Sequence, residues 1–260
     1  MLVRDIAVLE TVARSAPLGV QFWDSVDART VSNGLVLVTF APDEPRRRLS
    51  ASATPHDVFL IGMMLVVEVR DLYGRFLPFT WTPPMASPLQ PAHSLHRLPL
   101  FSAPSRLLPA GVGVVRAELH EPDGTPAASA VLEVTPPGQA PLRGMADDQG
   151  RVVVVVPYPP PEPEPLANAS PLAPLAAGGK RAAQTWRLLV RAAYQPLRPA
   201  PTLPDIDVAL AQPPAILWAD IARSAALTTL ELQFGRGTLL ASVDTTGLTR
   251  PSELLIQPVS

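Results

Sequence analysis

Short apolar runs alternate with turn-forming residues along the whole chain. The runs are rich in β-branched, aromatic and leucine residues, and Gly, Pro and Asp are frequent between them. Their sequences are VQFWDSV, GLVLVTF, DVFLIGMMLVVEVRD, FLPFTW, GVGVVRAEL, SAVLEV, RVVVVVPY, TWRLLVRAAY, TLELQF, TLLASV and ELLIQPV. Many short strands separated by turn signals are typical of β-sandwiches. The pattern therefore predicts an all-β chain with one or two sandwich units.

Proline sets the limits of these runs. The chain has 33 prolines, and a residue without an N–H group is confined to the edges, bulges and connections of a sheet. Helical spacing of apolar residues occurs in residues 1–16, where Ile6 and Leu9 share a face, and in residues 214–227, which begin with Pro214. We therefore expect at most one or two short helices.

The stretch GMADDQGRVVVVVPYPPPEPEP, residues 144–165, places an acidic turn, a valine strand and a proline run side by side. Asp147–Gly150 has the composition of a tight turn, because Asp can bond nearby backbone and Gly accepts a positive φ. The strand Val152–Val156 needs cover on both faces, because a half-exposed strand would alternate with polar residues. We expect it to be central in its sheet, to end at Pro157 and to lead into a proline-rich connection over residues 157–180.

The segment VVRAELHEPDGTPAASAVLEVTPPGQAPLRGMADDQGRVVVVVPYP, residues 114–159, carries a family pattern. Asp123–Pro126 forms a DGTP turn, Ala130–Val134 a second strand, and Ala146–Pro157 a closing turn and strand. In this order the three elements resemble the carboxypeptidase regulatory-like domain, a transthyretin-like β-sandwich. The resemblance implies immunoglobulin-like or transthyretin-like sandwich units and carries no reaction with it.

A weaker form of the same outline occurs earlier in the chain. Asp27–Thr30 stands where the turn belongs and Gly34–Phe40 where the next strand belongs, but SATPHDVFLIGM lacks the expected turn glycine. The sequence thus indicates three parts. They are an N-terminal arm (1–20), a degenerate sandwich unit (21–110) and a regulatory-like sandwich (111–260) with a proline-rich insertion (157–180) and C-terminal strands.

Several blocks outside this segment point to a class of assembly. GRFLPFTW, LPLFSAPSRLLPAGVGVV, LELQFGRG and PSELLIQPVS are similar to proteins whose regulatory-like domains accompany bacterial contractile injection systems, the phage-tail-like particles. The resemblance implies a structural or accessory subunit, as a decoration or near the cap or baseplate. Its implied partners are sheath, tube, cap or baseplate subunits, or copies of itself.

Composition and charge agree with a protein that contacts other proteins. Hydrophobic residues make up 47% and charged residues 17%, so we expect part of the surface to be covered. The net charge is −2 and the one tight basic run, Arg46–Arg48, is more typical of a solvated loop than of a phosphate site. Nucleic acid is therefore not an expected partner.

The N-terminal stretch and the apolar runs predict a cytoplasmic protein without a membrane span. Asp5 and Glu10 interrupt the region that would be apolar in a secretory signal. The run VFLIGMMLVVEV is much shorter than the roughly 20 residues that a spanning helix needs. We expect the protein in the cytoplasm, either alone or as part of an assembled or released particle.

Catalytic and metal-binding patterns favour a protein that is not an enzyme. The chain has no cysteine, which excludes disulfides and thiolate chemistry. His93 and His96 have a His-x-x-His spacing without a nearby carboxylate, so loop histidines are favoured over zinc ligands. Asp123, Asp147 and Asp148 have oxygen atoms of the kind that bind calcium, but turn formation accounts for all three. We expect no cofactor and no metal.

Three segments are the expected contact elements of a structural subunit. A pre-extended proline segment loses little entropy on docking, and a terminal arm can add to a neighbouring surface or sheet edge. The residues are Val3, Ile6 and Leu9 in the N-terminal arm, Tyr158, Pro159, Pro160 and Pro161 in the proline-rich segment, and Leu254, Leu255 and Ile256 near the C-terminus. The alternative hypothesis is a regulatory or ligand-binding sandwich module that serves a separately encoded enzyme.

Overall fold

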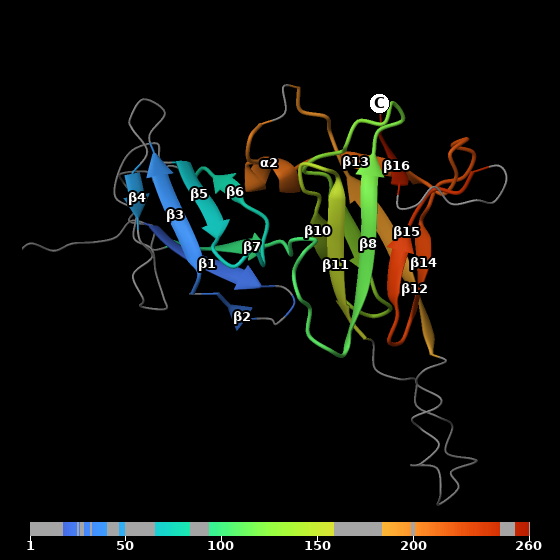
Figure 1. Cartoon of the computed structure of the whole chain (residues 1–260), viewed down its shortest axis with the longest axis horizontal. Helices are drawn as coiled ribbons and strands as arrows, with labels where there is room; N and C mark the ends of the chain where they lie inside the picture. The colour runs from blue at the N-terminus through green and yellow to red at the C-terminus, as the bar shows by residue number, and fades with distance from the viewer. Residues whose placement is uncertain are drawn as a thin grey trace, which may run out of the picture.

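The chain is nearly all β across the residues that the structure, a computed structural model, describes. These are residues 18–24, 26, 29–31, 33–40, 47–49, 66–83, 94–158, 184–198, 201–244 and 253–259. They form strands β1 to β16 and one short helix, α2, which confirms the predicted fold class (Figure 1). Each of the apolar runs identified in the sequence overlaps one of these strands.

The first seven strands form two small sheets, here called the N-terminal unit. One sheet has the order β2 (Arg29–Thr30), β1 (Leu18–Asp24), β7 (Ser94–Leu100), and β7 runs parallel to β1. The other has the order β4 (Arg47–Leu49), β3 (Leu35–Phe40), β5 (Val66–Asp71), β6 (Phe79–Trp81). Strand β4 contains Arg47 and Arg48, so part of the basic run predicted as a loop lies in a strand.

The remaining strands form one larger sheet system, here called the C-terminal unit. Its main path is β10-β9-β12-β13-β16-β8-β11, with β14 paired to β12 and β15 paired to β8. The strands are β8 (Val112–His120), β9 (Val131–Thr135), β10 (Leu142–Met145), β11 (Arg151–Pro157), β12 (Thr185–Ala193), β13 (Pro214–Trp218), β14 (Thr229–Gln233), β15 (Gly237–Leu240) and β16 (Glu253–Pro258). The two units lie side by side in Figure 1, the first in blue to green and the second in green to red.

The C-terminal unit folds back on itself because two long strands change partners along their length. Strand β12 pairs with β14 through Thr185–Leu189 and with β13 through Ala192 and Ala193. Strand β8 likewise pairs with β15 and then with β16 along one edge, while β11 lies on its other edge. The inward side chains of these strands enclose one buried core that includes Leu119, Leu132 and Leu188.

The valine strand β11 is covered on both faces, as predicted. Val152 to Val156 are all buried, and Val152, Val154 and Val156 belong to the core of the C-terminal unit. The expectation of a central strand was wrong. Among the described residues β11 pairs only with β8 and is the edge strand of its sheet, and packing buries its valines on both faces.

The acidic turn before β11 has the predicted chemistry. The Asp147 carboxylate accepts hydrogen bonds from the backbone N–H groups of Gln149 (2.9 Å) and Arg151 (2.9 Å). Gly150 has a φ of 76°, which other residues adopt with difficulty. The earlier turn follows the same rule, since Asp123 accepts from the N–H of Thr125 at 2.9 Å and Gly124 has a φ of 85°.

The only helix of the described chain lies outside the stretches with helical spacing. Helix α2 (Ile206–Leu210) begins at Asp205, whose carboxylate accepts from the N–H groups of Asp207 and Val208 as an N-cap. The helix predicted over residues 214–227 was wrong, because its first residues form β13 between β12 and β16. Neighbouring strands fix that backbone as extended, and a weak local helical pattern cannot compete with them.

Helix α2 connects the two units. It belongs to the chain between β12 and β13 of the C-terminal unit, but Ile206 and Ala209 are buried in the core of the N-terminal unit (0% and 1% exposed). In Figure 1 it lies between the two groups of strands. Met145 of β10 is buried in the same core. The N-terminal core is therefore completed by residues from the second half of the chain.

Two turn glycines with positive φ separate two costs of a Gly→Ala substitution, which are the strain of the backbone conformation and the clash of the new Cβ with its neighbours. At Gly124 an added Cβ meets nothing within 4 Å, whereas at Gly150 it would lie 2.3 Å from the carbonyl oxygen of Leu119. We expect Gly124→Ala to lower the free energy of unfolding by about 1–2 kcal/mol through its φ alone. Gly150→Ala should cost a further ~1–3 kcal/mol through the clash. Equal losses in urea denaturation would contradict this reading.

The docking of α2 predicts a local loss of stability that is confined to one unit. Ile206→Ala should lower the stability of the N-terminal unit by about 2–5 kcal/mol, since it removes a fully buried side chain. Val208, which is 50% exposed on the same helix, supplies the control Val208→Ala. Hydrogen–deuterium exchange should rise in β5 and β6 of the first variant and stay unchanged in β8 and β11. A uniform rise over both units would contradict the assignment of Ile206 to the N-terminal core.

Candidate functional site

The predicted contact residues that the structure describes are mostly packed against the rest of the protein. Leu254 and Ile256 are completely buried in the C-terminal core, because β16 lies between β13 and β8. This corrects the expectation for these two side chains, which are unavailable to a partner. Leu255 points to the other side of the strand and is partly exposed. Val3, Ile6, Leu9, Pro159, Pro160 and Pro161 lie outside the described residues.

Tyr158 belongs to a half-buried aromatic cluster. Its ring centroid lies 5.3 Å from that of Trp186 and 4.7 Å from that of Phe234. Its hydroxyl accepts a hydrogen bond from the backbone N–H of Gly235 at 2.8 Å. Gly113 permits this packing, because an added Cβ there would lie 3.2 Å from the Tyr158 ring. The side chain thus fixes the end of β11 against the turn after β14.

The candidate metal ligands do not come together. His93 lies outside the described residues, and His96 packs on Trp81 with ring centroids 5.5 Å apart. The Asp123 and Asp147 carboxylates are used by their own turns, and the backbone hydrogen bond from Thr125 lowers the pKa of Asp123. Within the described part of the chain, no group of three His, Asp or Glu residues is placed to hold a metal ion.

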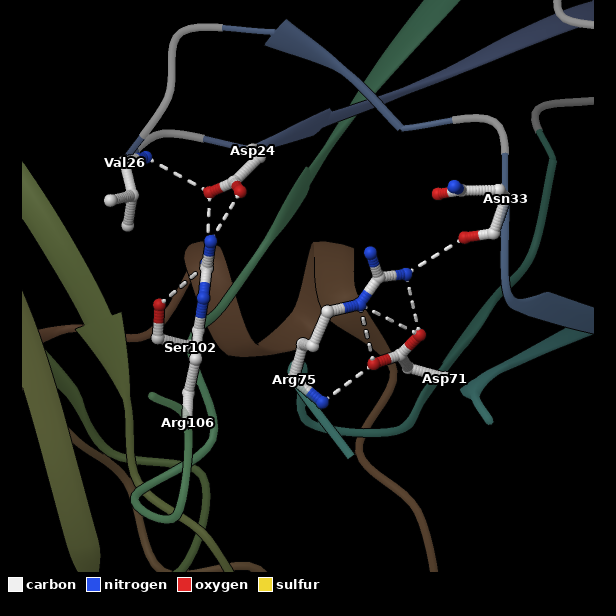
Figure 2. A network of polar contacts seen from close by, with 7 residues as sticks. All are labelled: Asp24, Val26, Asn33, Asp71, Arg75, Ser102 and Arg106. Carbon is white, nitrogen blue, oxygen red and sulfur yellow. Dashed lines mark hydrogen bonds and ion pairs between the residues drawn. The ribbon is translucent and has the colours of Figure 1, made fainter. Parts of the chain in front are cut away.

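The most unusual surface lies at one end of the N-terminal unit, where four loops meet; we call it the loop end. It consists of the turn after β1, the residues before β3, the turn after β5 and the chain after β7. Large apolar side chains are displayed here in the open. Leu72 and Tyr73 are 66% and 68% exposed, and Leu107 is 96% exposed. Two ion pairs, one buried and one partly buried, hold these loops together (Figure 2).

The first ion pair joins Asp24, at the end of β1, to Arg106 in the chain after β7. The two guanidinium nitrogens of Arg106 donate to the two carboxylate oxygens of Asp24 at 3.0 and 2.6 Å. The side chains are only 4% (Asp24) and 7% (Arg106) exposed. Arg106 also donates to the Ser102 hydroxyl at 3.1 Å, and the Val26 N–H donates to Asp24 at 2.9 Å. A two-pronged pair of this kind fixes both distance and orientation.

The second ion pair holds the exposed turn itself. The Arg75 side chain donates to both oxygens of Asp71, and its Nη2 also donates to the Asn33 carbonyl at 2.7 Å. Burial raises the pKa of Asp71, but the hydrogen bonds from the side chain and backbone of Arg75 outweigh it, so the net pKa is lowered. The same contact raises the pKa of Arg75. Both groups therefore stay charged over the whole physiological range.

Phe76 links the two pairs. The guanidinium carbon of Arg75 lies 5.1 Å from its ring centroid and that of Arg106 lies 4.7 Å from it. Both distances are within the range of cation–π attraction. Arg75 also lies 5.1 Å from the Tyr73 ring, and that ring rests on Gly34, where an added Cβ would lie 2.4 Å from it. Tyr73 is thus exposed and yet held in position.

The loop end is arranged for contact and offers little for catalysis. Of its described carboxylates, Asp24 and Asp71 are bound by arginine, and its exposed side chains include Leu72 and Tyr73 on a supported turn. The sequence contained one sign of it, because Asp71 and Arg75 flank the turn LYG. The pairing of Asp24 with Arg106 could not be found in the same way, since the two residues are 82 positions apart.

A cleft of about 470 Å³ separates the two units. The N-terminal unit contributes Leu77 and Ala103, the C-terminal unit contributes Ser129 and Met145, and residues 201–204 form a further wall. Ser129 has a φ of 64°, a strained conformation for a residue other than Gly. Its carbonyl accepts from the Gln212 side chain at 2.9 Å, which helps to hold the strained backbone.

No protein-family model, curated protein or solved structure matches this chain. The family resemblance of residues 114–159 stays a prediction. Among the described residues no helix has the length and apolar character needed to cross a membrane.

The buried pair of Asp24 with Arg106 predicts that loss of the arginine destabilises the protein strongly and that a second substitution at Asp24 restores stability. Arg106→Met should lower the free energy of unfolding by about 3–5 kcal/mol, because it leaves a buried carboxylate without its cation. Adding Asp24→Asn should restore much of this loss. The exposed pair of Arg143 with Glu133 is the matched control, and Arg143→Met should cost no more than about 1 kcal/mol in the same denaturation experiment. Similar losses for Arg106→Met and Arg143→Met would refute the assigned role.

Proposed function

We propose that this protein is a non-enzymatic structural or accessory subunit of a large protein particle and that it acts through protein contacts made by the loop end. The observation that carries the proposal is the open display of Leu72 and Tyr73 on a turn fixed by the ion pair of Asp71 with Arg75, next to the buried ion pair of Asp24 with Arg106. Leu72 and Tyr73 are neighbours in one turn, and adjacent exposed apolar side chains mark interaction sites more often than single exposed ones do.

The contacts that hold the loop end in place lower the entropy cost of binding a partner. Protein association has to offset the entropy lost when side chains and loops become ordered, at about 0.5–1.5 kcal/mol for each immobilised side chain. At the loop end Arg75 already holds the Tyr73 ring, and Asn33 and Asp71 already hold Arg75. Part of the ordering has therefore taken place before a partner arrives. Tyr is also among the residues that contribute most to interface energy.

The class of particle rests on the sequence. The resemblance to proteins that accompany contractile injection systems supports a phage-tail-like particle, with sheath, tube, cap or baseplate subunits, or other copies of the chain, as partners. Two sandwich units with supported loops also suit such a role, because sandwiches present their loops at their ends on a rigid frame.

A second candidate function is supported by the cleft between the units. Small-molecule sites are commonly clefts of about 300–1,000 Å³ at domain interfaces, and this cleft of about 470 Å³ is of that size. Ser129 adds a polar, strained residue to its wall. In this alternative the protein is a ligand-binding or regulatory module for a separately encoded enzyme.

The test is incorporation into a particle. The chain is co-expressed with the products of its flanking genes, high-mass assemblies are isolated by ultracentrifugation, and the amount of bound chain is measured. We expect Leu72→Ser with Tyr73→Ser to reduce incorporation at least about tenfold, since two anchors are removed. Leu239→Ser is the control, because Leu239 is 56% exposed on β15 of the other unit.

Far-UV circular dichroism and the melting temperature establish that both variants are folded. Equal incorporation of the double variant and the control would contradict the role of the loop end. A wild-type chain that never enters an assembly, but binds a small molecule in the cleft with saturation, would favour the second candidate.

A further inference from the structure

The two units are connected covalently by one exposed segment. Residues 107–111, here called the hinge, join the loop end to β8, and Leu107, Pro109, Ala110 and Gly111 are all exposed. Arg106, immediately before the hinge, is fixed to Asp24 of the N-terminal unit. Gly113, soon after it, is buried in β8. Most of the hinge therefore lies outside the packed cores of both units.

A second connection between the units is non-covalent. The clasp, residues 201–211, leaves the C-terminal unit and docks on β6 of the N-terminal unit. The Thr80 N–H donates to the Pro204 carbonyl at 2.8 Å, the Trp81 indole donates to Asp207 at 3.1 Å, and the Thr82 hydroxyl donates to Asp205 at 3.2 Å. Ile206 and Ala209 fill the core beneath.

Beyond the clasp, the described residues show a loose fit between the units. The cleft lies between them, and Met145 is the one other residue of the C-terminal unit in the N-terminal core. The clasp is thus the main contact between two parts that are joined by an exposed tether. Such a contact forms equally well within one chain or between two chains.

We propose that the clasp is exchanged between copies in the assembled state, so that the clasp of one copy docks on β6 of the next. The partner at this surface is a second copy of this chain. The exchange is a head-to-tail contact, and a repeated contact of this kind produces a ring or a filament. This inference rests on the proposed function, because exchange builds the repeated structure to which a particle subunit belongs.

Concentration decides between the two arrangements. The contacts of the clasp are the same in both, so their difference in free energy is set by the hinge. A short flexible tether gives an effective concentration in the millimolar range. A dilute solution therefore favours the closed single chain, whereas a particle surface, or a hinge too short to close, favours exchange.

The absence of cysteine from the chain permits a direct test. One chain carries Thr82→Cys and a second, distinguished by a larger tag, carries Asp205→Cys. The two are unfolded, mixed, refolded and oxidised at micromolar and at about millimolar concentration. We expect a disulfide-linked heterodimer whose yield rises at least about tenfold with concentration and which neither chain forms alone. A heterodimer yield that stays at the level of these single-chain controls at both concentrations would overturn the proposal.

Because Asp205→Cys removes the N-cap of α2 at a cost of about 1 kcal/mol, a second test uses a variant in which the clasp is unchanged. Deletion of Pro109 and Ala110 shortens the hinge and should shift the mass measured by light scattering from one chain to two or more. Adding Ile206→Asp, which destroys the docked face, should return it to one chain. A shortened chain that stays monomeric with its clasp docked would also overturn the proposal. The particle-subunit role is tested separately, by whether incorporation depends on Leu72 and Tyr73. A failure of the exchange proposal can therefore be distinguished from a failure of the proposed function.

Discussion

The burial of α2 in the N-terminal unit is the contact on which the arrangement of the whole molecule depends. The small sheets of this unit leave an apolar space that Ile206 and Ala209 fill from the other half of the chain. Asp205 serves both sides of this contact, since it caps the helix and accepts the hydroxyl of Thr82. Without the helix, the units would be joined by the hinge and, in the N-terminal core, by Met145.

The loop end solves a different physical problem. Exposed apolar turns tend to be mobile in the free protein, and a partner that binds them has to offset the entropy lost when they become ordered. Here two arginines are each tied to a carboxylate and share the Phe76 ring. The pair of Asp24 with Arg106 is largely shielded from solvent, so salt screens it less than it screens surface pairs. The loops are thus held both by ion pairs and by the packing of the arginines on the buried Phe76 ring.

The C-terminal unit supplies a stable frame for both features. Strands β8 and β12 each serve two successive neighbours, which lets the sheet close around one core. Within the described ranges, the chain leaves this frame for the clasp, between β12 and β13. The proposed contacts therefore lie on the N-terminal unit, and the C-terminal unit determines where that unit is held.

The sequence by itself determined the all-β class, the positions of most strands and the chemistry of the turns at Asp123 and Asp147. These properties depend on nearest neighbours, on β-branched side chains and on residues that accept a positive φ. Only the tertiary structure decided that residues 214–218 form a strand, that β11 ends the strand order and that Leu254 is in the core. It also decided the pairing of Asp24 with Arg106, because contacts between distant positions arise from the packing of complete strands, and no local pattern of residues encodes them.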